Sequence, residues 1–373
     1  MSIIQQLTDS ISAQISTLAP ITLSVPTTPI FQLSKFIHHI TNTPVHPVYF
    51  PYLRFGVIHA VRVTTVWAGL TKAKRGGGRL QDLFGYLVLA WGGSTVVSLL
   101  LNQPPSWLIS FTPWIIYISI YTLLIPTGLS RYFIETCPKI LFNVVGGLID
   151  GMTRGTTITS LITLISNSSL LKIASEQNQN SSNGEIGIWT YMILSGIAIS
   201  SGGVIVGLLG INENEWKLIT PNLLKGGILN TLDFSSSSLI GLLWLILLNQ
   251  NQSLESISKS LSNTLPQELK ISSKDKDELS IIDIPHARAI CVLVLGFILA
   301  IKGIILTFIA NGIKTKLVNK IDKKTELYIL DEKKSATRTE VIKTPIKIKQ
   351  NSNSSGSSSV KSTPRKSPRA KSK

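Results

Sequence analysis

Long runs of apolar residues alternate with shorter polar segments along this chain of 373 residues. Seven runs approach the roughly 20 residues that a helix needs to cross a bilayer. The first is the weakest, because His59 and Arg62 interrupt it. The pattern predicts an all-α polytopic membrane protein with seven transmembrane helices. They fall at about 53–71, 82–102, 110–128, 136–165, 187–211, 223–249 and 287–311.

Two of these runs carry a glycine pair near the centre. Gly92-Gly93 lies in the second run and Gly202-Gly203 in the fifth. Glycine inside a helix costs about 0.5–1 kcal/mol relative to alanine, so a central pair is not there for stability. It lets a helix bend, or lets another backbone or an ion come close. We predict bends in two pore-lining helices, with close packing of small residues as the alternative.

The first six runs divide into two groups of three, and the middle run of each group carries the glycine pair. The third runs also open alike, with Ser110-Phe111 in one and Asp233-Phe234 in the other. Because three is an odd number of spans, successive groups insert in opposite senses. We therefore expect an inverted 3+3 repeat followed by a seventh helix, with the functional site where the two middle helices meet.

The flanking segments differ from this core in composition. Residues 1–52 form an N-terminal segment without a standard secretory signal, and its stretch Phe31–Ile40 has the pattern of an interfacial helix. From residue 312 the chain is rich in Lys, Ser and Thr and too poor in apolar residues to bury a core. The predicted organisation is an N-terminal segment 1–52, a transmembrane domain 53–311 and a disordered basic tail 312–373.

The distribution of charge sets the tail apart and predicts the orientation of the chain in the membrane. Only 15% of the residues are charged, against about 25% in an average soluble domain. Residues 311–373 hold 17 Lys or Arg and 5 Asp or Glu, a net +12 of the total +16. The loop after the first run is also basic, with Lys72, Lys74, Arg75 and Arg79. Basic loops face the cytosol, so the C-terminus is predicted to be cytosolic. The sequons at Asn167, Asn180 and Asn251 then fall in loops on the other side.

Several segments resemble the trimeric intracellular cation (TRIC) channels. Residues 69–107 (GLTKAKRGGGRLQDLFGYLVLAWGGSTVVSLLLNQPPSW) contain a basic turn, Asp-x-x-Gly, a mid-helix Gly-Gly, Leu-Leu-Leu and a proline before an aromatic residue. That order is similar to the first helical hairpin of the family. Residues 194–209 and 233–248 resemble its fifth and sixth spans, so the likeness covers roughly residues 54–311.

The resemblance implies a homotrimeric potassium channel of the endoplasmic reticulum or nuclear membrane, which supplies counter-ion flux for calcium release or uptake. Each protomer would hold a pore lined by its second and fifth helices. The implied partners are monovalent cations and membrane lipids. Two other functions stay open. One is a secondary transporter with a midplane site in the repeat, and the other is a non-conducting scaffold that acts through its basic tail.

The chain departs from the family at three places. Val96-Val97-Ser98 stands where many members carry an acidic residue, and Ile199-Ser200 where animal members have a lysine. The phosphoinositide motif of the fourth span corresponds to residues 146–155 (GGLIDGMTRG), where Arg154 is the one cation. Binding of a phosphoinositide or another lipid is therefore left open.

The candidate site residues are hydroxyls and charges within the runs. The pore-lining candidates flank the glycine pairs: Ser94, Thr95, Ser98, Ser200 and Ser201. Their hydroxyls either replace part of a cation's hydration shell or bond to a carbonyl one turn earlier. Asp150 and Arg154 share a helix face. They are predicted to form a charged lining or a lipid contact, with a self-neutralising pair as the alternative.

Other charges have more local explanations. Lys139 begins the fourth run and is expected to reach the headgroups. Lys302 lies well inside the seventh run, and its stem is long enough to reach toward an interface. His59 and Arg62 share a face of the first run, as candidates for a pore or subunit interface. Asp233 is predicted to cap a helix, because four serines follow it.

Enzymatic chemistry finds no support in the sequence. No His/Cys metal spacing, phosphate-binding glycine loop or nucleophile with a plausible base is present. We predict neither an enzyme nor a bound cofactor. Cys137 and Cys291 are expected to be packing residues rather than a disulfide. The tail has no aromatic platform for nucleic acid, and its Thr363 and Ser367 precede proline among basic residues, as candidate phosphorylation sites.

Overall fold

The computed structural model describes residues 27–71, 78–168, 187–266, 269, 282–309 and 312. The chain divides into two compact units, Met1–Asn311 and Gly312–Lys373, and the elements below belong to the first. The predicted disordered tail, the loop lysines Lys72 and Lys74 and the sequon at Asn180 lie outside the described residues.

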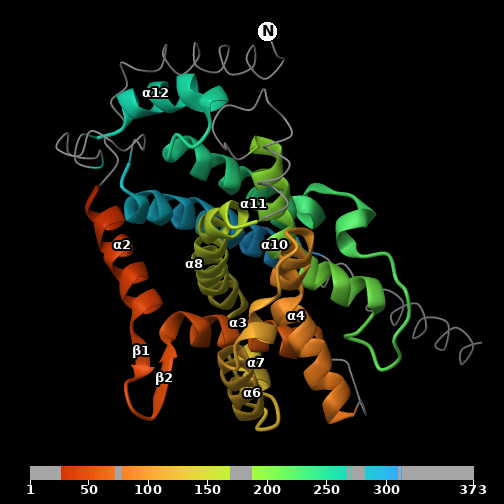
Figure 1. The fold of residues 1–373 in the computed structure, drawn as a ribbon. Coiled ribbons are helices and arrows are strands. Elements are labelled where there is room, and N and C mark those ends of the chain that lie inside the picture. Colours follow the sequence, from red (N-terminus) through yellow and green to blue (C-terminus); the bar gives the residue numbers. More distant parts are fainter. Residues whose placement is uncertain are drawn as a thin grey trace, which may run out of the picture. The chain divides into compact units, whose positions relative to one another are not determined.

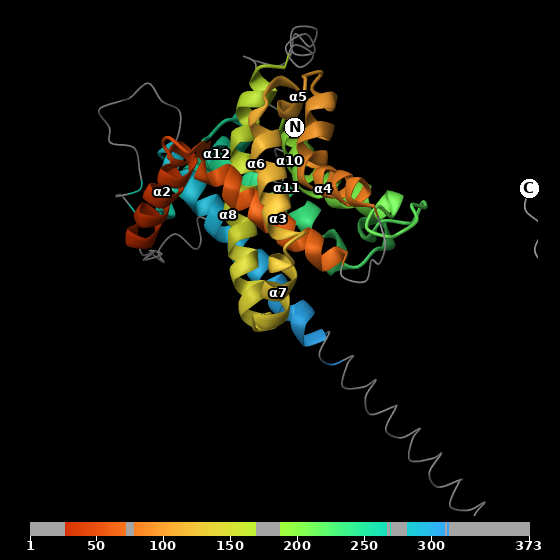
Figure 2. The ribbon, with the colours of Figure 1, turned by 90° about the horizontal axis from the view of Figure 1, so that it is seen from below.

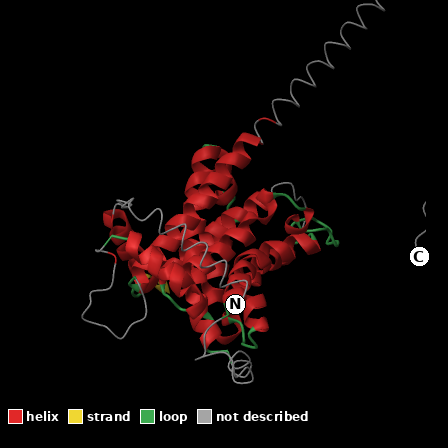
Figure 3. Ribbon diagram, turned by 90° about the horizontal axis from the view of Figure 1, so that it is seen from above, coloured by secondary structure: helices red, strands yellow, loops and turns green. Residues whose placement is uncertain are grey.

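Helices make up most of the described chain (Figures 1 and 3). Their order agrees with the apolar runs, with a small hairpin before the first run. The elements are α2 (Thr27–Asn42), β1 (Pro44–His46), β2 (Phe50–Leu53), α3 (Arg54–Leu70), α4 (Arg79–Leu100), α5 (Ser106–Ile109), α6 (Thr112–Leu124), α7 (Leu129–Thr136), α8 (Lys139–Ser166), α10 (Ile188–Leu209), η2 (Asn222–Lys225), α11 (Ile228–Leu247), η3 (Gln252–Leu254), α12 (Glu255–Thr264) and a last long helix, Ile284–Ile309.

Four of the described helices are long and apolar enough to cross a membrane: α4, α10, α11 and helix 284–309. The pair α6–α7 makes a fifth if it is counted as one span. This supports a multi-pass all-α membrane protein. α3 has only 17 residues, and α8 is diluted by glycine, threonine and charged residues. Each of the seven runs contains a helix. Because α3 and α8 are not among the helices that are long and apolar enough to cross, the number of spans remains a prediction.

A short helix, α7, follows the third run, which the sequence analysis did not expect. α6 ends at Leu124 and α7 continues at an angle of 65°. Pro126 lacks the amide hydrogen that would continue the helix. Gly128 then takes a left-handed φ of 73°, where a side chain would be strained. These two residues turn the chain before α8 begins at Lys139.

The helices pack through three groups of buried side chains. One lies among α8, α10, α11 and helix 284–309, and includes Tyr191, Trp244 and Leu295. A second joins α3, α4 and α6 around Trp67 and Tyr86. α10 packs against both α4 and α11, which places it between the two groups. Figure 2 shows α4, α10 and α11 close together when the molecule is turned.

Candidate functional site

The two glycine pairs meet where α4 crosses α10. A Cβ atom on Gly92 would lie 2.9 Å from the Gly202 Cα, and one on Gly93 only 1.9 Å from the Ala198 carbonyl oxygen. Gly85 lies near Ile211 at one end of the contact, so the two helices run antiparallel. Both are unbroken from their first residue to their last. The structure therefore shows close approach of two continuous helices here, and the bends at the glycine pairs stay a prediction.

Gly203 differs from the other three glycines of the two pairs. No heavy atom lies within 4 Å of the position that its Cβ would take. The residue is exposed, so it does not belong to the contact itself. Gly202 does: its Cβ position is 2.5 Å from the Leu89 carbonyl oxygen. The pair in α10 thus has one packed and one open member.

The hydroxyls beside the glycines mostly turn back to their own helix. Ser200 Oγ donates to the Gly196 carbonyl at 2.7 Å, and Ser201 Oγ to the Ile197 carbonyl at 2.7 Å. Ser94 and Thr95 both donate to the carbonyl of Trp91. This is the alternative to lining a path that the sequence analysis left open. The hydroxyl oxygens still keep acceptor capacity, which Thr95 uses for the indole N–H of Trp107 at 2.9 Å.

A cavity of about 220 Å³ lies beside the crossing. Ser94 and Val97 from α4 and Ala198 from α10 form one side of it. Phe55 and residues of α8, including Thr156 and Ser160, form the other.

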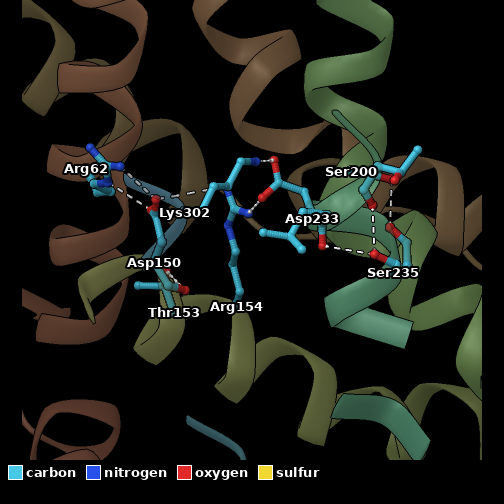
Figure 4. A network of polar contacts seen from close by, with 11 residues as sticks. Arg62, Asp150, Thr153, Arg154, Ser200, Asp233, Ser235 and Lys302 are labelled. Carbon is cyan, nitrogen blue, oxygen red and sulfur yellow. Dashed lines mark hydrogen bonds and ion pairs between the residues drawn. The ribbon is translucent and has the colours of Figure 1, made fainter. Parts of the chain in front are cut away.

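Five charged side chains from four helices form a network (Figure 4). Arg62 of α3 donates to Asp150 of α8 through two parallel bonds, Nε to Oδ1 at 2.8 Å and Nη2 to Oδ2 at 2.7 Å. Asp233 of α11 accepts from Arg154 Nη1 at 3.0 Å and from Lys302 Nζ at 2.8 Å. These side chains are mostly buried. Their exposed fractions run from 16% for Lys302 to 35% for Asp233. Ser200 and Ser235 lie on the Asp233 side of the network in Figure 4.

Arg154 joins the two halves of this network. Its Nη2 lies 4.0 Å from Asp150 Oδ2, while its Nη1 bonds Asp233. Three cations face two carboxylates, so one positive charge remains unmatched within the network. Arg62 and Lys302 each have a closer carboxylate, which makes Arg154 the shared cation.

The network corrects several predictions for single residues. Asp150 and Arg154 form an ion pair at 4.0 Å, but each has a closer partner on another helix, so the pair is not closed on itself. Asp233 does not cap α11, since it lies inside the helix, which begins at Ile228. Lys302 ends on Asp233 rather than at an interface.

The remaining candidates lie elsewhere. His59 hydrogen-bonds with the Tyr117 hydroxyl of α6. It does not hydrogen-bond with Asp150, the carboxylate partner of Arg62. Lys139 is exposed at the first residue of α8, outside the network. Ser98 is buried beside Val97. Cys137 and Cys291 are both free thiols.

Sequence reasoning missed a second glycine contact, between α8 and helix 284–309. Cβ atoms on Gly147 and Gly151 would lie 2.6 Å from Ala300 N and 2.2 Å from the Gly296 Cα. Gly155 continues the stripe against Val292. The signal was present as three glycines four residues apart, the spacing of one helix face. This contact brings helix 284–309 against α8, and the side chains of Lys302 and Arg154 both reach Asp233.

Four buried hydroxyls of α10 and α11 have no hydrogen-bond partner among the described residues. They belong to Ser195, Ser236, Ser237 and Ser238. Ser238 packs over Gly196, and Ser195 over Gly241. Sequence analysis associated Ser235–Ser238 with a helix start, whereas they lie in the middle of α11. Buried hydroxyls without a protein partner commonly bind water or an ion.

Comparisons with known proteins do not identify the chain. A scan against models of protein families finds no match, and a search of curated proteins finds no similar sequence. Among the described residues, no group of three or more His, Cys, Asp or Glu side chains is placed to hold a metal ion. The resemblance to the TRIC channels therefore remains a prediction.

Proposed function

We propose that this protein is a monovalent cation channel, selective for potassium, whose pathway is constricted where α4 crosses α10. The observation that carries the proposal is the side-chain-free crossing of two apolar antiparallel helices with a cavity of about 220 Å³ directly beside it. Two backbones in contact at Gly92 and Gly202 close any path between them. Separation of the two helices would join the crossing to the cavity.

Polar groups near the crossing support an aqueous path. Unpartnered hydroxyls such as those of Ser236 and Ser237 are costly in an apolar interior unless water or a cation contacts them. Hydroxyl and carbonyl oxygens can replace part of the hydration shell of a monovalent cation. Both serines lie one turn from Asp233 on α11, so the hydroxyls and the network occupy neighbouring parts of one helix.

The charged network supports a role in ion movement or its control. Ionisable side chains at membrane depth are costly, and they usually face a cavity or mark an ion pathway. Asp233 is the most exposed of the five, at 35%. A carboxylate with partial access to water favours a cation over an anion, while Arg154 and Lys302 limit that preference.

The seven spans and the inverted repeat rest on the pattern of apolar runs and glycine pairs. The homotrimer and the location in the endoplasmic reticulum or nuclear membrane rest on the sequence resemblance. The antiparallel course of α4 and α10 is the arrangement that an inverted repeat requires for its two middle helices. A role in counter-ion flux for calcium follows from the same resemblance.

Reconstitution into planar bilayers tests the proposal. Purified full-length protein should produce unitary currents in potassium chloride, with a reversal potential that follows the potassium gradient. Saturable uptake of a substrate without unitary current would instead identify a secondary transporter. Folded protein that shows neither current nor uptake would exclude both functions and favour the scaffold.

A further inference from the structure

The hairpin that precedes α3 carries exposed apolar side chains. Tyr49 at its turn is 86% exposed and Val48 is 74% exposed. Val45 and Leu53 are each about half exposed. Residues 43–53 (TPVHPVYFPYL) contain no Lys, Arg, Asp or Glu. A turn in water is normally polar, so this composition calls for a partner.

This hairpin is an ordered element. β1 and β2 pair antiparallel, with Pro44 opposite Leu53 and His46 opposite Phe50. Within the turn, the backbone amides of Val48 and Tyr49 both donate to Nδ1 of His46, at 3.2 and 3.1 Å. These bonds hold the two exposed side chains together at the tip.

The base of the hairpin is tied to its neighbours. Arg54 Nε donates to the Pro44 carbonyl at 3.1 Å, and the backbone amide of Arg54 donates to the Thr43 carbonyl at 3.1 Å. Arg54 Nη1 lies 2.7 Å from His39 Nε2 of α2. A cationic side chain at the first residue of α3 therefore lies at the base of the hairpin.

α2 buries most of its apolar side chains, and Phe36 is half exposed. Its apolar face, with Ile30, Ile37 and Ile40, is buried in a group that includes Met152 of α8 and Val292 of helix 284–309. Phe31 also packs edge-on against the His286 ring, 4.6 Å between centroids. The predicted interfacial helix thus uses its apolar face for protein contacts, and it positions the hairpin at the start of α3 (Figure 1).

We infer that the hairpin tip inserts into the interfacial region of the lipid bilayer, at the boundary of headgroups and acyl chains. The unit contains four helices that are long and apolar enough to cross a membrane. β2 ends at Leu53 and α3 begins at Arg54 without a linker, so the hairpin is continuous with the helical bundle. Tyrosine with aliphatic neighbours is favoured at this boundary, where one end of the ring is apolar and the other is wet.

Fluorescence quenching in vesicles tests this inference. A nitrobenzoxadiazole probe is attached to Tyr49→Cys in the full-length protein, in which Cys137→Ser removes the accessible thiol and the buried Cys291 is left in place. The matched control is Gln32→Cys, an exposed position on α2. Vesicles of phosphatidylcholine and phosphatidylserine contain lipids with a nitroxide on the acyl chain near the headgroup.

The probes at the two positions should respond oppositely to the lipid-bound and the aqueous quencher. At position 49 we expect a blue-shifted emission, quenching by the nitroxide lipids and little quenching by aqueous iodide. At position 32 we expect iodide quenching and little effect of nitroxide. Equal iodide quenching at both positions would place the hairpin in water. Protection of position 49 from both quenchers would show that protein covers it. Either result would overturn the inference, and an unchanged gel-filtration profile confirms that each variant is folded.

Discussion

Arg154 is the residue on which the charged network depends. It lies between Asp150 and Asp233, while Arg62 and Lys302 each bond one of these carboxylates directly. A shared cation with two carboxylate partners has two neighbouring places to rest. Under the proposed channel function, a shift of α8 relative to α11 would leave each carboxylate with a cationic partner.

Loss of the Arg62 partner should destabilise the fold. Asp150→Asn leaves a guanidinium that is 16% exposed without its carboxylate, and unpairing a buried ion should cost roughly 2 kcal/mol or more. The control is Glu255→Gln on α12, whose ion pair with Lys259 is exposed and is worth at most about 1 kcal/mol. Thermal unfolding in detergent should show a lower midpoint for the first variant alone. Equal midpoints would mean that water already solvates Arg62.

The unpartnered hydroxyls separate packing from conduction. Ser236→Ala removes a buried hydroxyl without a protein partner, so stability should be unchanged or higher by about 1 kcal/mol. If that hydroxyl contacts water or a cation in the pathway, the potassium current should fall. Ser235→Ala, at an exposed hydroxyl bonded to the Thr231 carbonyl, should leave the current unchanged. An unaltered current in both variants would assign Ser236 to packing.

Single residues were the hardest to predict. The spacing of Asp150 and Arg154 correctly placed them on one face, but their best partners lie 88 and 79 positions away in the sequence. Only the packing of the helices brings such residues together. Asp233 was misassigned because the serines that follow it are typical of a helix start. In α11 the two left-handed glycines Gly226 and Gly227 mark that start instead.

Helix pairs in this protein approach through glycine faces. Gly92 and Gly202 bring α4 against α10, and the stripe of Gly147, Gly151 and Gly155 brings α8 against helix 284–309. In a membrane, small residues of this kind allow van der Waals contact between backbones. The second contact is extended by Asn143, whose Nδ2 lies 2.5 Å from Thr307 Oγ1.

The glycine stripe on α8 allows a specific prediction, because the glycines on the two facing helices differ in the space around them. A Cβ on Gly151 would lie 2.2 Å from the Gly296 backbone, whereas one on Gly296 would meet only ordinary contacts, the nearest at 3.5 Å. Gly151→Ala should therefore destabilise the fold by about 1–3 kcal/mol. Gly296→Ala should be neutral. Thermal unfolding of both variants checks this, and equal loss in the two would show that the helices are spaced differently.

Elements were predicted better than residues. A helix lies at every apolar run, because runs of this length are a strong signal. The break between α6 and α7 could have been read from Pro126 and Gly128, which terminate helices for known reasons. The predicted glycine bends were harder to judge, since a glycine pair permits both a bend and a close contact. Which one forms depends on the partner helix.

At the scale of the whole molecule, the division at Asn311 has a direct consequence. Met1–Asn311 is compact without Gly312–Lys373. A chain shortened after Asn311 should unfold at the same temperature as the full chain and conduct potassium equally. Bilayer recordings and thermal unfolding check the two parts of this prediction. A shortened chain that folds but loses all function would favour the scaffold that acts through its tail.

The central claim is that the α4–α10 crossing constricts the pathway, and paired alanine variants test it most directly. Gly93→Ala forces a Cβ to within 1.9 Å of the Ala198 carbonyl oxygen unless the helices separate, whereas Gly203→Ala enters open space. Single-channel recording in planar bilayers should show a higher open probability or conductance for Gly93→Ala and an unchanged current for Gly203→Ala. Identical potassium currents from the folded variants, or no current from either or from the parent protein, would contradict the account.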